Sequence, residues 1–137
     1  MKTCFTSWFL VFALVLLGAG CEDLFDPMSK YEHDWVVPSN ISGTWFHSQP
    51  TEVAQGDGYI ISQNGSSASV THFFRRLDDS TFIAQFHPYQ GTYDQSSGLL
   101  TYTIISEFYM RFASDTEMWS VDSPSSDRGI LGPFNKE

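Results

Sequence analysis

Histidines are the side chains of this sequence best suited to bind a metal or to move a proton near neutral pH. The four of them, His33, His47, His72 and His87, are scattered, and none share the H-x-H or H-x-x-x-H spacing of a common ligand face. A zinc site needs three or four converging ligands. The sequence therefore predicts neither a metal site nor a cofactor.

His72 is the histidine that we expect to point inward. It alternates with Val70 and Phe74 along a strand-like run, and alternate residues of a strand share one face. A histidine on an apolar face needs a hydrogen-bonding partner, and Glu107 or Tyr102 is expected to supply it. His72 could also meet His87 across adjacent strands, but histidines at the surface or at a rim are the interpretation that the scattered spacing favours.

The carboxylates and hydroxyls form no catalytic pattern. Asp78 and Asp79 are adjacent, but they stand in a turn-forming stretch in which carboxylates cap the backbone. Asp115, Glu117 and Asp122 could bind calcium weakly, yet they lack the ligand loop of calcium sites, which favours a solvated face. No serine lies in a nucleophile-elbow motif, and no phosphate-binding glycine loop is present. We expect a protein that is not an enzyme.

The composition points to an acidic chain with an aromatic core. The formal net charge is −9 and aromatic residues make up 16% of the sequence. Nucleic-acid binding needs a dense basic face, so that class of function is excluded. Large aromatic side chains bury much area each and stabilise one another as pairs.

The first twenty residues have the pattern of a secretory signal peptide. Lys2 precedes an apolar run from Phe9 to Leu17, and Gly18, Ala19 and Gly20 follow. The run is too short for a bilayer span, which needs roughly 20 apolar residues. We predict a signal peptide over residues 1–20.

Cys21, directly after those small residues, resembles the lipobox cysteine of bacterial lipoproteins, although Gly18 stands where that family usually has leucine. The resemblance implies cleavage before Cys21 and acylation of that residue, with palmitate among the acyl chains. It also implies a lipid-anchored protein of the bacterial cell envelope, expected at the outer membrane on its periplasmic or surface face. Glu22 and Asp23 could act as a surface-export signal or simply begin a polar tether.

The remaining chain divides into a flexible tether and one domain. Residues 21–40 are acidic and show neither helical nor strand periodicity, which is typical of a tether. Residues 41–137 alternate short runs rich in β-branched and aromatic residues with turn clusters, which indicates an antiparallel meander. We expect strands over residues 43–47, 58–63, 69–76, 81–87, 99–105, 107–113, 117–121 and 129–134. Turns are expected at the intervening clusters, 55–57 among them.

Each expected strand has one apolar face, as a sheet closed around a core requires. Phe82, Ala84 and Phe86 share one face, and Met110 shares another with Phe112. Tight turns favour up-and-down order, and closure removes the exposed edges. The sequence therefore predicts an all-β fold: a single up-and-down antiparallel barrel of about eight short strands.

Gly43–Thr44–Trp45 resembles the G-x-W motif that opens the first strand of lipocalins and related small barrels. Gly91–Thr92–Tyr93, followed by Leu99–Tyr102, is similar to the hairpins of bacterial lipocalin-like domains. The resemblance implies that Gly43 and Trp45 define the fold, with the tryptophan plugging the closed end. It also implies a late basic residue packed across that ring, for which Arg128 and Lys136 are the candidates.

The sequence is compatible with two alternative functions. In the first, the barrel is a non-catalytic module that binds a small apolar ligand. In the second, the barrel is solid and contacts an envelope protein, as an inhibitor or assembly factor; the shortness of the domain favours a filled interior. The side chains expected to line a ligand site are His72, Phe74, Phe86, Tyr102, Met110 and Phe112.

Overall fold

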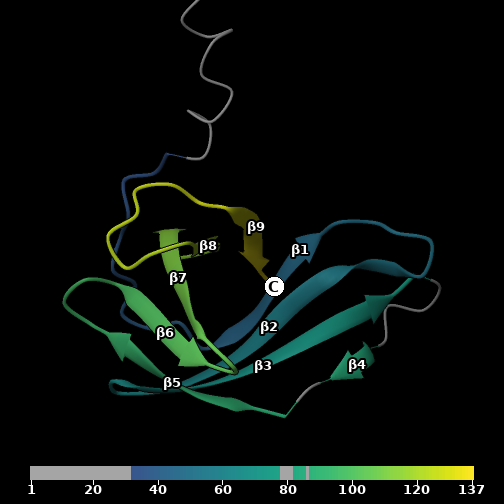
Figure 1. Ribbon diagram of the computed structural model, residues 1–137, viewed down its shortest axis with the longest axis horizontal. Helices are drawn as coiled ribbons and strands as arrows, with labels where there is room; N and C mark the ends of the chain where they lie inside the picture. The colour runs from purple at the N-terminus through teal and green to yellow at the C-terminus, as the bar shows by residue number, and fades with distance from the viewer. Residues whose placement is uncertain (1–31, 78–81, 86) are drawn as a thin grey trace, which may run out of the picture. The chain divides into compact units, whose positions relative to one another are not determined.

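The chain folds into antiparallel strands joined by short connections (Figure 1). The computed structural model describes residues 32–77, 82–85 and 87–137, and no helix occurs among them. The strands are β1 (Gly43–Ser48), β2 (Ala54–Asn64), β3 (Ser67–Arg76), β4 (Phe82–Gln85), β5 (Tyr89–Asp94), β6 (Leu99–Thr103), β7 (Glu107–Ser114), β8 (Glu117–Val121) and β9 (Leu131–Lys136).

Eight of these strands close into a ring. Neighbours pair in the order β2-β1-β9-β8-β7-β6-β5-β3, and β3 pairs back to β2. Every pairing is antiparallel, and successive strands of the ring lie side by side. The predicted all-β, up-and-down barrel is confirmed.

Two details of the prediction were wrong. The expected strands include none over residues 89–94, although the resemblance of Gly91–Thr92–Tyr93 indicated a hairpin there. The strand β5 closes the ring on β3 through Ser67–Val70, whereas β4 pairs with the far end of β3. The turn expected at residues 55–57 is instead the beginning of β2, with a bulge between Ala54 and Gly56. A Cβ atom on Gly56 would lie 2.0 Å from the His47 carbonyl oxygen, so this glycine permits a close strand approach.

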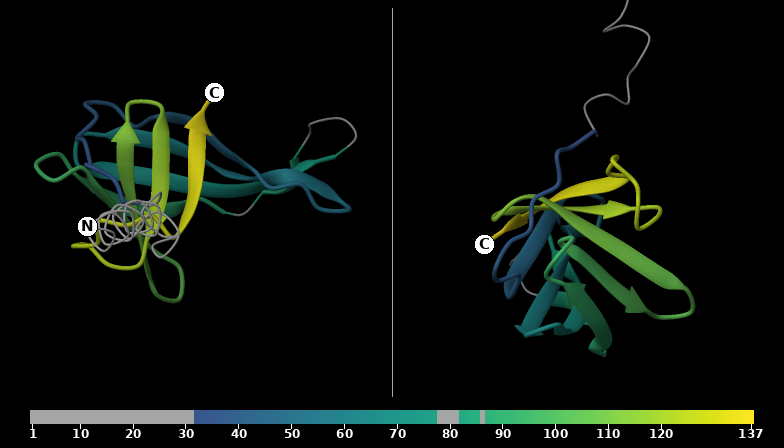
Figure 2. Two further views of the ribbon diagram at one scale, coloured as in Figure 1. Left: turned by 90° about the horizontal axis from the view of Figure 1, so that it is seen from above. Right: turned by 90° about the vertical axis from the view of Figure 1, so that its left-hand side faces the viewer.

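The two ends of the barrel differ, and we name them by their connections. The mouth carries the β1–β2, β6–β7 and β8–β9 connections and the end of β3. The closed end carries the β2–β3, β5–β6 and β7–β8 turns. Figure 2 (left) shows the β7–β8 turn on the opposite side of the barrel from the β6–β7 turn. Because β2 and β3 are the longest strands, they extend the mouth beyond their neighbours.

Trp45 fills the closed end. Its side chain is fully buried, its indole Nε1 donates to the Ile41 carbonyl at 2.9 Å, and its ring meets Phe112 at 5.4 Å. Lys136 Nζ lies 5.2 Å from the Trp45 ring centroid. A Cβ atom on Gly43 would be 2.8 Å from Lys136 Cε, so the glycine makes room for the lysine. Of the two basic candidates, Lys136 covers the tryptophan.

Outside the barrel, a second aromatic contact ties β1, β2 and β3 together. Phe46 and Phe73 stack at 6.4 Å across Gly58, where a Cβ atom would meet the Phe73 ring at 2.7 Å. The Arg75 guanidinium covers Phe46 at 4.1 Å and donates to both carboxylate oxygens of Glu137, at 2.5 and 2.6 Å. These contacts hold the chain beyond β9 against β3.

Residues 32–41, most of which the sequence analysis assigns to the tether, run along the barrel from the mouth to the closed end. At the mouth Glu32 pairs with Arg128, and the His33 ring packs 4.7 Å from Trp119. At the closed end the Tyr93 hydroxyl donates to the Pro38 carbonyl at 2.7 Å. We call this segment the strap. The described part of the chain contains no helix that could span a membrane.

The strap should contribute measurably to stability through Tyr93. Tyr93 is fully buried, so Tyr93→Phe leaves the Pro38 carbonyl without its donor and is expected to lower the free energy of unfolding by about 1–2 kcal/mol. The matched control is Tyr109→Phe, which removes an exposed hydroxyl bonded to Glu107 and should cost less than about 0.5 kcal/mol. Urea unfolding measures both, and equal effects would contradict the anchoring of the strap at this point.

Candidate functional site at the mouth of the barrel

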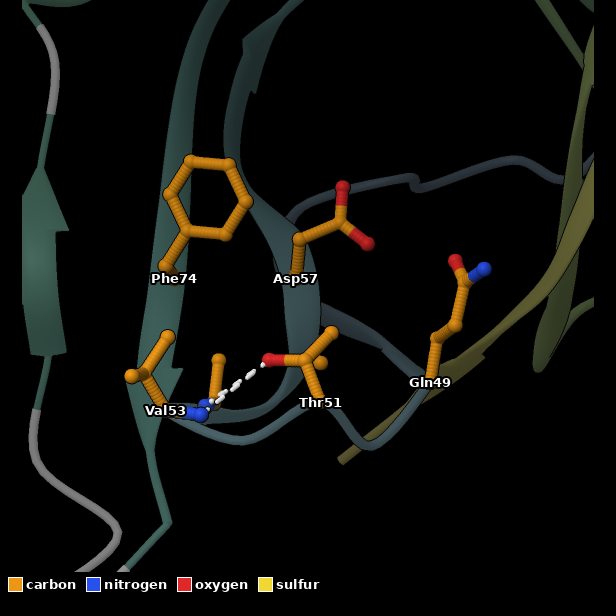
Figure 3. Close-up of a pocket in the computed structure, with 7 residues that line it drawn as sticks. Gln49, Thr51, Val53, Asp57 and Phe74 are labelled. Carbon is orange, nitrogen blue, oxygen red and sulfur yellow. Dashed lines mark hydrogen bonds between the residues drawn. The ribbon is translucent and has the colours of Figure 1, made fainter.

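A cavity of about 340 Å³ lies at the mouth, between the β1–β2 loop and the outer parts of β2 and β3 (Figure 3). Phe74 and Val53 form its apolar walls, and Asp57 supplies a carboxylate. The complete lining is Gln49, Thr51, Val53, Ala54, Gly56, Asp57 and Phe74.

The β1–β2 loop that forms one wall is held by its own hydrogen bonds. The Thr51 hydroxyl accepts from the Val53 and Ala54 amides at 3.4 and 3.1 Å, as the dashed lines in Figure 3 show. The Thr51 amide donates to the Ala54 carbonyl, and the Gln49 amide to the Gln55 carbonyl. A threonine that bonds the backbone two and three residues on is a turn-forming element. The wall is therefore pre-formed.

Asp57 lines the cavity, and its carboxylate is paired with His72, which is not one of the lining residues. His72 Nε2, on β3, donates to Asp57 Oδ2, on the neighbouring strand β2, at 2.9 Å. Both side chains are only partly exposed, at 23% and 16% for His72 and Asp57. The His72 ring packs against Phe74 and Tyr59, each with centroids 5.0 Å apart. Aromatic contacts on two sides fix the orientation of the imidazole.

The sequence analysis did not name Asp57 as a partner of His72. Glu107, one of the two expected partners, accepts a hydrogen bond from the Tyr109 hydroxyl, and Tyr102, the other, is buried in the core. The sequence analysis did not select Asp57 as a site residue, because it assigned residues 55–57 to a turn. The period-2 pattern of Asp57, Tyr59 and Ile61 would have placed it on the inward face of β2.

Two tyrosines of the core lie next to the His72–Asp57 pair. Tyr59 donates to Tyr102, and their rings meet at 6.1 Å. Burial is the main reason that the pKa of each hydroxyl lies above its usual value, and the nearby Asp57 carboxylate raises both further. Both hydroxyls thus remain neutral at physiological pH.

The predicted ligand residues lie at three depths. His72 and Phe74 are together at the mouth, and Tyr102 is below them. Met110 and Phe112 are almost fully buried, with Phe112 packed on Trp45 and Tyr93, so they belong to the core. Phe86 and the lipidation candidate Cys21 lie outside the described residues.

The other candidate polar groups do not converge. Glu117, from the weak calcium candidate, accepts from Trp119 Nε1 at 2.7 Å. Within residues 32–77, 82–85 and 87–137, no three histidine, cysteine, aspartate or glutamate side chains are placed to hold a metal ion.

Comparison with protein-family models, with curated proteins and with solved structures finds no match to this chain.

The buried tyrosines should make stability fall at alkaline pH. Above pH 10 the unfolded chain loses protons that folded Tyr59 and Tyr102 keep, so the free energy of unfolding falls as pH rises, by up to about 1.4 kcal/mol per pH unit for one tyrosine. Tyr59→Phe is expected to make this slope shallower. Urea unfolding across the range measures it, and the two proteins should show parallel curves below about pH 9. An unchanged slope above pH 10 would contradict the placement of Tyr59.

Proposed function

We propose that the protein is a non-catalytic binding module of the bacterial cell envelope, which holds a small, mainly apolar ligand in the cavity at the mouth of its barrel. The observation that carries the proposal is the cavity itself: an apolar wall from Phe74 and Val53 beside the Asp57 carboxylate. A volume of about 340 Å³ lies at the small end of the range typical of ligand pockets.

The polar side of the cavity indicates which ligands are favoured. Asp57 faces the cavity with its carboxylate, and the chain as a whole has a formal net charge of −9. An anionic head group would meet like charge at short range, which is unfavourable in a partly desolvated site. The expected ligand is therefore neutral or cationic at its polar end.

The second candidate function is a solid barrel that contacts an envelope protein. The filling of the closed end by Trp45, Tyr93 and Phe112 favours it, because no ligand can reach that depth without displacing a buried ring. A ligand at the mouth does not require such a displacement. We therefore retain ligand binding as the main proposal.

A pair of related fluorescent probes tests ligand binding. N-phenyl-1-naphthylamine is neutral, and its 8-sulfonate carries one negative charge on the same ring system. The neutral probe is expected to bind about tenfold more tightly, because only the sulfonate faces Asp57 unfavourably. Asp57→Asn should strengthen binding of the sulfonate and change binding of the neutral probe little. Fluorescence titration measures both.

The control for net charge is Asp115→Asn, at the β7–β8 turn of the closed end. It removes the same charge and should leave the ratio of the two affinities unchanged. If neither probe binds, the ligand proposal is rejected and the solid barrel is favoured.

The envelope location is proposed from the resemblance of Cys21 to a lipobox cysteine. Cells grown with labelled palmitate are expected to incorporate the label into the protein, and Cys21→Ala should abolish incorporation. Gel electrophoresis with detection of the label measures this. Incorporation that persists in the variant would show that lipid is attached elsewhere.

A further inference from the structure

The two ends of the barrel differ in the polarity of their connections. The closed-end turns are made of polar residues and glycine, at residues 64–66, 94–98 and 114–116. The mouth connections instead carry exposed aliphatic side chains. We call these the rim: Val53, Leu77, Ile104, Ile105, Ile130 and Leu131.

The most exposed rim residues lie on separate connections. Ile105 is 98% exposed at the β6–β7 turn, Val53 is 72% exposed in the β1–β2 loop, and Ile130 is 58% exposed beside β9. Single exposed aliphatic residues need no explanation. Most of the exposed aliphatic side chains of the described residues lie on the connections of the mouth, whereas near the closed-end turns the strap contributes Val37, at 44% exposure. This unequal distribution indicates a surface that meets an apolar phase.

The course of the strap indicates which phase that is. Glu32 is held at the mouth by Arg128, and the His33 amide donates to the Asp127 carbonyl at 3.0 Å. Glu32, the first described residue, therefore lies on the rim side of the barrel. Ten residues lie between Cys21 and Glu32. The eleven steps from one to the other can span at most about 40 Å. An anchor at Cys21 would therefore hold the domain by its rim end.

We propose that the rim docks onto the lipid surface to which the protein is anchored, so that the cavity opens toward the membrane. This inference rests on the lipid anchor of the proposed function. Separate, protruding side chains suit a fluid surface, which needs no fixed complementary shape, and interfacial binding grows with the apolar area inserted. Glu52, Glu107 and Asp127 stand beside rim residues, so a zwitterionic surface is favoured over an anionic one.

Such docking gives the cavity a source of ligand. Val53 belongs both to the rim and to the cavity lining. A molecule leaving the bilayer there would enter beside Val53 and meet Phe74 with its apolar part and Asp57 with its polar end. The ligand class inferred from this geometry is a neutral or cationic membrane amphiphile.

The test uses the lipidated protein in phosphatidylcholine vesicles that contain spin-labelled lipid. Ile105→Cys and Ser66→Cys introduce thiols at the mouth and at the closed end, and each is labelled with a nitrobenzoxadiazole fluorophore. Both positions are exposed turns, so neither substitution disturbs the core. The label at position 105 is expected to be quenched several-fold more strongly than the label at position 66.

A second comparison isolates the rim itself. Val53→Ser combined with Ile130→Ser, in the Ile105→Cys protein, should shift the equilibrium away from the docked state about tenfold or more, because two apolar side chains no longer insert. The matched control is Val37→Ser, which removes a 44% exposed valine packed near the closed-end Gly98 and should not change quenching.

The outcomes separate this inference from the proposed anchor. Protein that fails to sediment with vesicles lacks the anchor. The proposed lipid anchor and the proposed docking are then both rejected, whereas ligand binding is tested separately with the two probes. Protein that sediments while both labels stay unquenched keeps the anchor and overturns docking. Shielding of position 105 in native membranes but not in pure lipid overturns docking onto lipid and identifies a protein contact.

Discussion

The fold depends on the pairing of β9 with β1. Only Trp45–Lys136 and Phe46–Asn135 are in register there, and the Glu137 amide adds a bond to the Thr44 carbonyl at 2.9 Å. This short seam turns an open meander into a ring with an inside and an outside. Side-chain contacts reinforce this seam on both faces. Inside the ring Lys136 covers Trp45, and outside it Arg75 binds Glu137. Without closure, neither a sealed end nor a mouth would exist.

Once the ring is closed, polarity changes steadily along its axis. Trp45 and Phe112 fill the closed end without an unpaired polar group between them. Neutral tyrosine hydroxyls follow at Tyr59, and the ionisable His72 and Asp57 come last. Charge is placed where water still reaches it, because a buried unpaired charge is costly. The mouth is therefore the part of the barrel in which a cavity lies beside ionisable side chains.

Much of this architecture was predictable from the sequence. Alternation placed Met110, Phe112 and His72 on inward faces, and the turn clusters gave most strand boundaries. The strand β5 was missed because Pro88 and Gly91 interrupt its pattern, although both are tolerated where only part of β3 is paired. Asp57 was missed since glycines on both sides mimic a turn. Long-range partners such as Arg75 and Glu137 leave no local signal, because register alone brings them together.

The route of the strap determines how the protein would respond to mechanical load. Tension applied to the chain before Glu32 acts first on the Glu32–Arg128 pair and then on the His33–Trp119 contact. These contacts would yield one after another, whereas the strands of the ring would have to shear together. The first residues of the strap would therefore detach before the ring opens, whereas Ile41 at its end is fully buried in the core and would stay in place.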